Sequence, residues 1–146
     1  MRILIQKVES ASIFINKQKI SQIDSGLLIF VGIDEQDDKS DIDTAVSLIT
    51  QNRLIPDENG KFCFSLKDKN QPLLVIPQFT LCAQFSGKKP NFLKAKKPAL
   101  AIKIFDNLVS SLISQKTTVV TGKFGAYMKV HCINDGPVNF YFDTKL

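Results

Sequence analysis

The sequence predicts one α/β domain over residues 1–146, in which layers of a mixed, partly barrel-like β-sheet are covered by two helices. Two apolar runs, 27–33 and 73–81, are typical of strands buried on both faces of a sheet. Apolar residues within 42–49 and 101–112 instead recur at helical spacing. Because no linker, internal repeat or low-complexity tract interrupts this order, we expect strands and helices to share one core.

The boundaries of the elements follow from turn signals and from capping residues. The first helix is expected from Ser40, which forms a capping pair with Asp43, to about Asn52. The second has Pro98 in its first turn and ends near Gln115. Strands are expected over residues 2–8, 11–16, 20–23, 27–33, 62–64, 73–81, 117–120, 124–133 and 137–142.

The composition favours a cytosolic protein and gives no sign of a metal centre. No apolar run reaches the roughly 18 residues of a membrane span, and the charges of Arg2 and Lys7 come too early for a signal peptide. The three cysteines lack C-x-x-C spacing, which predicts free thiols in a reducing cytosol. His131 is the only histidine, so a histidine-based metal cluster is excluded, and no phosphate-binding glycine motif occurs.

Positive charge is concentrated in the second half of the chain. Residues 1–80 carry nine Lys and Arg against eleven Asp and Glu, whereas residues 81–146 carry ten Lys against three Asp. A one-sided basic surface suggests an anionic partner, nucleic acid first, although a charge that only aids solubility is the alternative. The segment 88–97 contains Lys88, Lys89, Lys94, Lys96 and Lys97 with Phe92 among them. Such a loop suits phosphates and a stacked base, and a merely solvated loop is its alternative.

Polar side chains enter the apolar run 73–81 at its end. If the strand continues, Gln78 and Thr80 share one face while Phe79 takes the other. An amide and a hydroxyl placed in this way either satisfy each other or face a ligand. A cysteine nucleophile is the weaker alternative, because His131 and the adjacent Cys132 point to opposite faces of a strand and only a pairing of His131 with Cys82 stays open.

Two motifs taken together identify a family. Pro77-Gln78-Phe79-Thr80-Leu81 with Asn134-x-Gly136-Pro137-Val138 resembles the D-aminoacyl-tRNA deacylase family. Either motif alone is weak, but both occur in order and at the family's spacing. The resemblance covers essentially the whole chain and includes Ile5-Gln6-Lys7-Val8, Gly26-Leu27-Leu28, Val31-Gly32, Gly87-Lys88, Pro90-x-Phe92 and Gly125-Ala126-x-Met128.

The resemblance implies a chiral-proofreading hydrolase of translation. The family cleaves the ester between a D-amino acid and the terminal ribose of tRNA, removes glycine from mischarged tRNA, and works as a homodimer without metal or cofactor. Gly136-Pro137 is expected in the cis form, presented by one subunit into the pocket of the other, with Lys7 helping to hold it. Backbone carbonyls there bind the substrate's amino group and leave no room for an L side chain.

The same resemblance assigns the reacting end of the site. Gln78, Thr80 and the Phe79 backbone N–H are expected to line the ester and to position and polarise it. Thr80 has no neighbouring base in the sequence, so the 2′-hydroxyl of the tRNA itself is the favoured assistant. The lysines of 88–97 and Phe92 are then the expected tRNA contacts, and Phe124 and Met128 the expected pocket walls.

Three positions depart from the family's pattern. Lys7 replaces an Arg and loses its forked hydrogen bonds, Pro77 replaces a Ser, and Asn139 replaces a Thr. The Pro-Gln pair is also similar to a sister group that edits an L-aminoacyl error. The alternatives are therefore the same fold with relaxed or L-directed editing, and a non-catalytic RNA-binding module that uses only the lysines.

Overall fold

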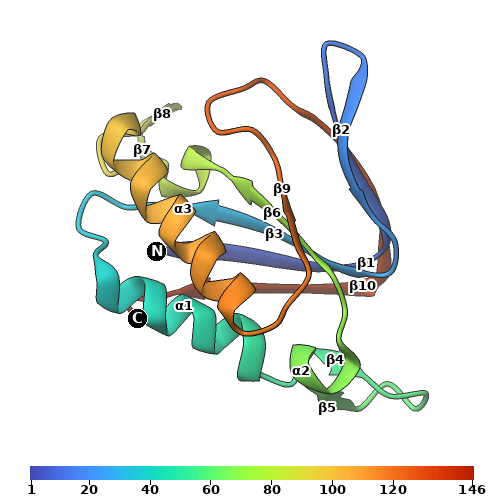
Figure 1. The fold of residues 1–146 in the computed structure, drawn as a ribbon. Helices are drawn as coiled ribbons and strands as arrows, with labels where there is room; N and C mark the ends of the chain where they lie inside the picture. Colours follow the sequence, from blue (N-terminus) through green and yellow to red (C-terminus); the bar gives the residue numbers. More distant parts are fainter.

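The computed structural model describes residues 1–146 and contains one six-stranded mixed sheet with helices on one face (Figure 1). The order in the sheet is β10-β1-β3-β6-β9, and β2 pairs with the outer half of β1. Strands β1, β2, β3 and β10 pair antiparallel, whereas β3, β6 and β9 run parallel. These strands are β1 (Arg2–Ile15), β2 (Gln18–Ile23), β3 (Gly26–Gly32), β6 (Leu73–Pro77), β9 (Val119–Thr121) and β10 (Lys129–Asp143).

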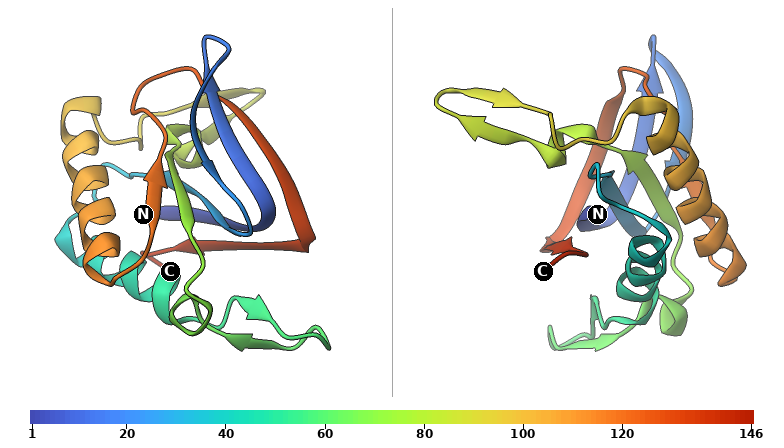
Figure 2. Two further views of the ribbon diagram at one scale, coloured as in Figure 1. Left: turned by 45° about the vertical axis from the view of Figure 1, so that its right-hand side comes forward. Right: turned by 90° about the vertical axis from the view of Figure 1, so that its left-hand side faces the viewer.

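Helices α1 and α3 lie side by side across the sheet, and smaller elements surround them (Figures 1 and 2). The predicted fold class and both predicted helices are confirmed, and a third, one-turn helix α2 is added. The helices are α1 (Lys39–Gln51), α2 (Leu66–Lys69), α3 (Pro98–Ser114) and the 3₁₀ turn η1 (Phe79–Cys82), and the two small hairpins are β4 (Ile55–Pro56) with β5 (Phe62–Phe64) and β7 (Gln84–Ser86) with β8 (Lys89–Asn91). No helix combines the length and the apolar character that a membrane span requires.

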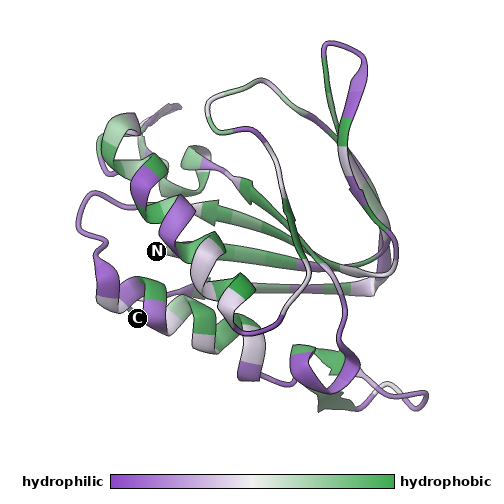
Figure 3. Ribbon diagram, viewed as in Figure 1, coloured by the Kyte–Doolittle hydropathy of each residue, from purple (hydrophilic) through white to green (hydrophobic).

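Two apolar clusters hold the sheet from its two faces. The larger contains 18 buried residues and joins alternate residues of β1, β3 and β6 to the inner faces of α1 and α3. The smaller contains seven and fills the inside of the curl that β1, β2 and β10 form (Figure 2). Strands β3 and β6 contribute to both clusters, which confirms that they are buried on both faces and explains their continuous hydropathy (Figure 3).

The capping box of helix α1 lies two residues before the predicted pair of Ser40 and Asp43. Asp38 is its N-cap and accepts a hydrogen bond from the Ser40 amide at 2.8 Å, while Asp41 accepts one from the Asp38 amide at 3.0 Å. Either serine or aspartate can fill an N-cap position. Asp38 and Asp41 complete the reciprocal capping box, so the helix begins at Lys39.

Two pairs of separately predicted strands, 2–8 with 11–16 and 124–133 with 137–142, are joined in the structure into the long strands β1 and β10. Strand β1 continues through residues 9 and 10, because β3 pairs with its first half and β2 with its second. Strand β10 continues through Asn134–Gly136, because Asn134 pairs with Val8 and Asn139 pairs with Gln6. Lys7 thus stands opposite the four residues 135–138, which bulge from the ladder. Residues 124–128, predicted as strand, form a turn before β10.

The strand predicted over 73–81 ends at Pro77, which corrects the alternating faces expected for Gln78, Phe79 and Thr80. Strand β3 last pairs with it at Pro77 and β9 at Val75, so no neighbour remains for the following residues. The chain instead satisfies its backbone locally through Leu81 N–H to Gln78 O at 3.2 Å and Ala83 N–H to Thr80 O at 3.1 Å. These bonds close the η1 turn.

The N-terminal ammonium lies buried beside Asp143 and Thr144 at the C-terminal end of the chain. The ammonium of Met1 donates to Asp37 at 2.7 Å and lies 3.8 Å from Asp41. Burial raises the pKa of Asp37 above its usual value. Burial also acts to raise the pKa of Asp41, but hydrogen bonds from Lys145 and Thr144 outweigh it and lower that pKa to about 2.

Candidate active site

The η1 turn presents the predicted catalytic residues at the end of the sheet. The backbone N–H of Gln78 donates to the backbone carbonyl oxygen of Val31 at 2.7 Å, and this bond connects the start of the turn to β3. Gly32 lies directly beneath the turn, where a Cβ would meet the Leu81 Cβ at 2.8 Å and the Gln78 carbonyl oxygen at 3.1 Å. Only glycine permits this close approach of strand and turn. Gly32 therefore determines how closely the η1 turn packs on β3.

Within the turn, the Gln78 and Thr80 side chains touch. The Gln78 amide Nε2 donates to Thr80 Oγ1, which is the only side-chain hydrogen-bond partner of Thr80. An amide cannot take up the proton of a hydroxyl, so Thr80 lacks the base that a nucleophile needs. Phe79 and Thr80 are both exposed, and Gln78 is half-buried. The turn therefore offers polar groups for positioning and polarising a bound group rather than an activated nucleophile.

A cavity of about 500 Å³ opens beside the turn, between η1, the segment that follows β8 and the N-terminus of α3. Its walls are mostly apolar, and its polar side chains come from Gln78, Lys96 and Lys97. The ring of Phe79 meets the ring of Phe92 edge to face, with centroids 5.0 Å apart, at this cavity. The lining residues are Val31, Ile33, Pro77, Gln78, Phe79, Phe92, Ala95, Lys96, Lys97, Pro98, Ala101, Phe124 and Gly125. Size and lining suit a small ligand held by apolar contact and a few polar groups.

Of the two side chains expected to form the pocket walls, only Phe124 lines the cavity. Phe124 lines the cavity, with its ring centroid 6.1 Å from that of Phe105 in α3. Met128 does not line it, because its side chain packs on the smaller apolar cluster, where a Cβ on Gly122 would lie 2.6 Å from its sulfur. The turn at 124–128 causes this difference, since the predicted strand would have placed both side chains on one face.

The cysteine alternative finds no support in the geometry. Cys82 is buried, and burial raises the pKa of its thiol to about 11, so the thiol stays protonated. His131 lies on an exposed part of β10 opposite Ser12, and its ring is tilted by 44° against that of Phe14, with centroids 4.8 Å apart. Cys82 and His131 therefore form no catalytic pair.

Four of the five predicted tRNA-contacting lysines fall into two groups, and the fifth, Lys94, pairs with Glu35. Lys88 and Lys89 lie at the tip of the β7–β8 hairpin, which projects from the body of the protein (right view of Figure 2). Lys96 and Lys97 line the cavity, and the Nζ of Lys96 donates to Glu35 O at 2.7 Å. The Lys94 ammonium lies 3.0 Å from Glu35, whose hydrogen bond raises the pKa of Lys94.

The Gly136-Pro137 bond is cis and lies in the bulge of β10 opposite Lys7. The Lys7 ammonium pairs with Asp135, and Asn134 Nδ2 donates to Lys7 O at 2.9 Å. Asn139 accepts from Gln6 Nε2 at 3.0 Å and donates to Asn134 at 3.3 Å. Lys7 and Asn139, two of the departures noted in the sequence, thus hold the base of the bulge.

One chain does not bring its Gly-Pro bulge to its own η1 turn. Lys7 pairs with Leu27 at one end of β3, whereas Gln78 bonds to Val31 near the other end. Four residues of strand correspond to about 13 Å. The two motifs therefore occupy opposite ends of the sheet within a single chain.

With both motifs located, comparison with known proteins decides the family. The family model described as D-Tyr-tRNA(Tyr) deacylase matches residues 4–143. The chain belongs to this family. A D-aminoacyl-tRNA deacylase of Teredinibacter turnerae is 41% identical over 145 residues, which cover 99% of this chain and 100% of that relative.

Solved structures share the fold of this chain. The structure called c-Myc DNA Unwinding Element Binding Protein superposes with a TM-score of 0.91 at 33% identity and covers 98% of both chains. A probable eukaryotic D-amino acid tRNA deacylase superposes with a TM-score of 0.83 at 14% identity over 97% of both chains, which shows the shared fold.

Sequence reasoning missed part of the site. Val31, Ile33 and Ala101 carry no signal of their own, because apolar residues on core elements look the same whether or not a cavity lies beside them. Arg2 also contacts the η1 turn, through a hydrogen bond to Leu81 O at 2.9 Å. A charge at the start of an otherwise apolar strand was the available signal for Arg2.

Proposed function

We propose that this protein hydrolyses the ester bond of D-aminoacyl-tRNA and releases free amino acid and tRNA as a proofreading step of translation in the cytoplasm. The observation that carries the proposal is the η1 turn, where Gln78 and Phe79 line a cavity of about 500 Å³ together with Lys96 and Lys97, and Thr80 contacts Gln78. Membership of the deacylase family and a relative of that name at 41% identity support the same activity.

In this proposal the cavity receives the aminoacylated 3′-terminal nucleoside. Water attacks the ester carbonyl, the bond to the ribose 3′-oxygen breaks, and a proton passes to that oxygen as the carboxylic acid leaves. Gln78, Thr80 and the Phe79 backbone N–H orient the ester and stabilise the oxyanion. Because Thr80 touches only the Gln78 amide, the neighbouring 2′-hydroxyl of the tRNA is the better group to relay the proton.

Chirality is proposed to depend on a second copy of the chain. The Gly136-Pro137 bulge of one subunit enters the cavity of its partner in a homodimer, since the two motifs lie at opposite ends of the sheet within one chain. Backbone carbonyls of the bulge hold the amino group and occupy the space of an L side chain. Glycine has no side chain to exclude, so glycyl-tRNA is a second proposed substrate.

Binding of the tRNA is assigned to the two groups of lysines. Lys96 and Lys97 at the cavity are suited to the terminal phosphates, and Phe92 to a stacked base. Lys88 and Lys89 on the projecting hairpin reach further along the acceptor stem. Neither of the hairpin lysines is held by a carboxylate, which leaves both charges free for phosphate.

The deciding experiment measures deacylation of one tRNA charged with D-tyrosine or with L-tyrosine, using the wild type and Thr80→Ala. Release of D-tyrosine alone supports the proposal, and a residual rate in Thr80→Ala supports proton relay by the tRNA. Release of both isomers moves the protein to relaxed editing. Binding of tRNA without release of either would leave the non-catalytic RNA-binding module.

A further inference from the structure

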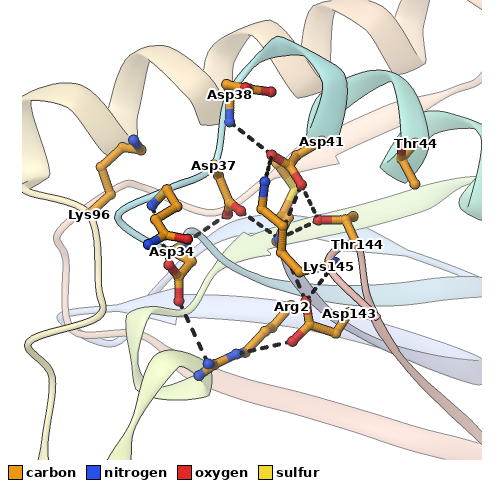
Figure 4. A network of polar contacts seen from close by, with 12 residues as sticks. Arg2, Asp34, Asp37, Asp38, Asp41, Thr44, Lys96, Asp143, Thr144 and Lys145 are labelled. Carbon is orange, nitrogen blue, oxygen red and sulfur yellow. Dashed lines mark hydrogen bonds and ion pairs between the residues drawn. The ribbon is translucent and has the colours of Figure 1, made fainter.

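Arg2 links the η1 turn to the acidic loop that precedes α1, residues 34–38 (Figure 4). It opens β1, where it pairs with Gly32 on β3 and with Asp143 on β10. Its Nη1 donates to the carbonyl oxygen of Leu81, the third residue of the turn, at 2.9 Å. The side chain is 21% exposed, so this contact is shielded without being fully buried.

Two carboxylates fix the guanidinium in this position. Asp34 lies 3.6 Å from Nη2, and Asp143 lies 3.5 Å from Nε. A planar guanidinium has donors in three directions, so Arg2 serves the carbonyl and both carboxylates at once. A lysine ammonium at the same place would be a point charge and would not reproduce the planar arrangement of donors that a guanidinium offers.

The acidic loop also carries the opposite wall of the cavity. Asp34 forms an isolated bridge with Ala95, the Glu35 amide donates to Lys94 O at 2.7 Å, and the Lys96 amide donates to Ile33 O at 2.9 Å. Ala95 and Lys96 line the cavity opposite the turn. Arg2 thus connects this loop, and with it the 94–97 wall of the cavity, to the η1 turn by polar contacts, beside the contact of the Phe79 and Phe92 rings.

The loop itself is anchored in the core. The Asp34 amide donates to Asp37 at 2.7 Å, and Asp37 accepts from the buried Met1 ammonium at 2.7 Å. A chain of polar contacts therefore runs from buried groups through Asp34 and Arg2 to the turn. This chain of contacts ends at the carbonyl oxygen of Leu81, the residue that follows Thr80.

We propose that Arg2 is a positioning residue for the reaction. It fixes the position and orientation of the η1 turn relative to the cavity wall that residues 94–97 form. This inference rests on the proposed deacylase function for its kinetic consequence, but its structural content does not depend on the substrate. Arg2 does not line the cavity, so its loss disturbs the alignment of the ester more than the binding of tRNA.

The kinetic test compares Arg2→Met and Arg2→Lys with the wild type. Arg53, the only other arginine, is exposed and distant from the cavity, so Arg53→Met is the matched control. We expect kcat for D-tyrosyl-tRNA to fall about tenfold in Arg2→Met, with KM within about twofold, and only partial recovery in Arg2→Lys. Arg53→Met is expected to keep the kcat of the wild type.

The second readout is amide hydrogen exchange of segment 78–83, which needs no substrate. Faster exchange there in Arg2→Met, with exchange in β1 and β3 unchanged, supports the inference. Unchanged exchange together with unchanged kcat overturns it. If Arg2→Met does not fold, Arg2→Lys and Asp34→Asn are judged by the same two outcomes. A wild type that releases no amino acid refutes the proposed function, while the exchange measurement still decides the role of Arg2.

Discussion

Gly32→Ala tests whether the η1 turn must sit directly on β3. The added methyl group would lie 2.8 Å from the Leu81 Cβ, 3.1 Å from the Gln78 carbonyl oxygen and 3.2 Å from the Cys82 sulfur. Ordinary contacts begin at 3.4 Å, so the turn must rise by about 0.6 Å at the least. The atoms that block the methyl group belong to the turn itself, which places the whole displacement on the residues of the site.

The expected losses follow from this displacement. Overpacking of a buried contact costs about 1–3 kcal/mol of unfolding free energy. Misplacement of a reacting group by about 1 Å can cost about 100-fold in rate, so a shift of this size predicts a fall in kcat/KM of about 10- to 100-fold. Activity is therefore expected to fall further than the loss of folded protein explains.

The assay is kcat/KM for D-tyrosyl-tRNA, measured with urea unfolding of the same preparation. Gly60→Ala in the β4–β5 turn is the control, because Gly60 has φ +80° and no atom within 4 Å of an added Cβ. It costs about 1 kcal/mol through backbone strain and should leave activity unchanged. A folded Gly32→Ala protein with kcat/KM within about twofold of the wild type would refute the reasoning.

Three further results are expected. Because the pKa of Asp41 is about 2 when folded and 3.8 otherwise, Asp41→Asn should lose about 2 kcal/mol of stability near pH 7. That difference from the wild type should vanish as pH falls from about 5 to 2 in urea melts, and a pH-independent difference contradicts it. Lys7→Met removes the ion pair at the base of the Gly-Pro bulge, so the ratio of D to L rates should drop about tenfold, with Lys116→Met unchanged. Lys88→Gln combined with Lys89→Gln should lower the salt slope of tRNA affinity by about 2, and an unchanged slope argues against hairpin contact.

Local patterns were sufficient to predict most of the fold. Strands β3 and β6 and helices α1 and α3 were predicted because burial on two faces and burial on one helical face leave different periods in the sequence. The end of strand β6 at Pro77 and the continuity of β10 across residues 134–136 were not predicted. Each depends on whether a neighbouring strand offers partners, and no local pattern contains that information.

Some features of the candidate site were likewise predicted from the sequence, and others were visible only in the structure. The Gln78–Thr80 motif and the lysines were identified from the sequence alone, and the side-chain contact of Gln78 with Thr80 was one of two foreseen arrangements. The exclusion of Met128 from the cavity and the contact of Arg2 with Leu81, 79 residues away, were decided only by the tertiary structure. Side-chain chemistry is fixed by residue type, but which groups meet depends on how distant segments pack, and that is set by the core as a whole.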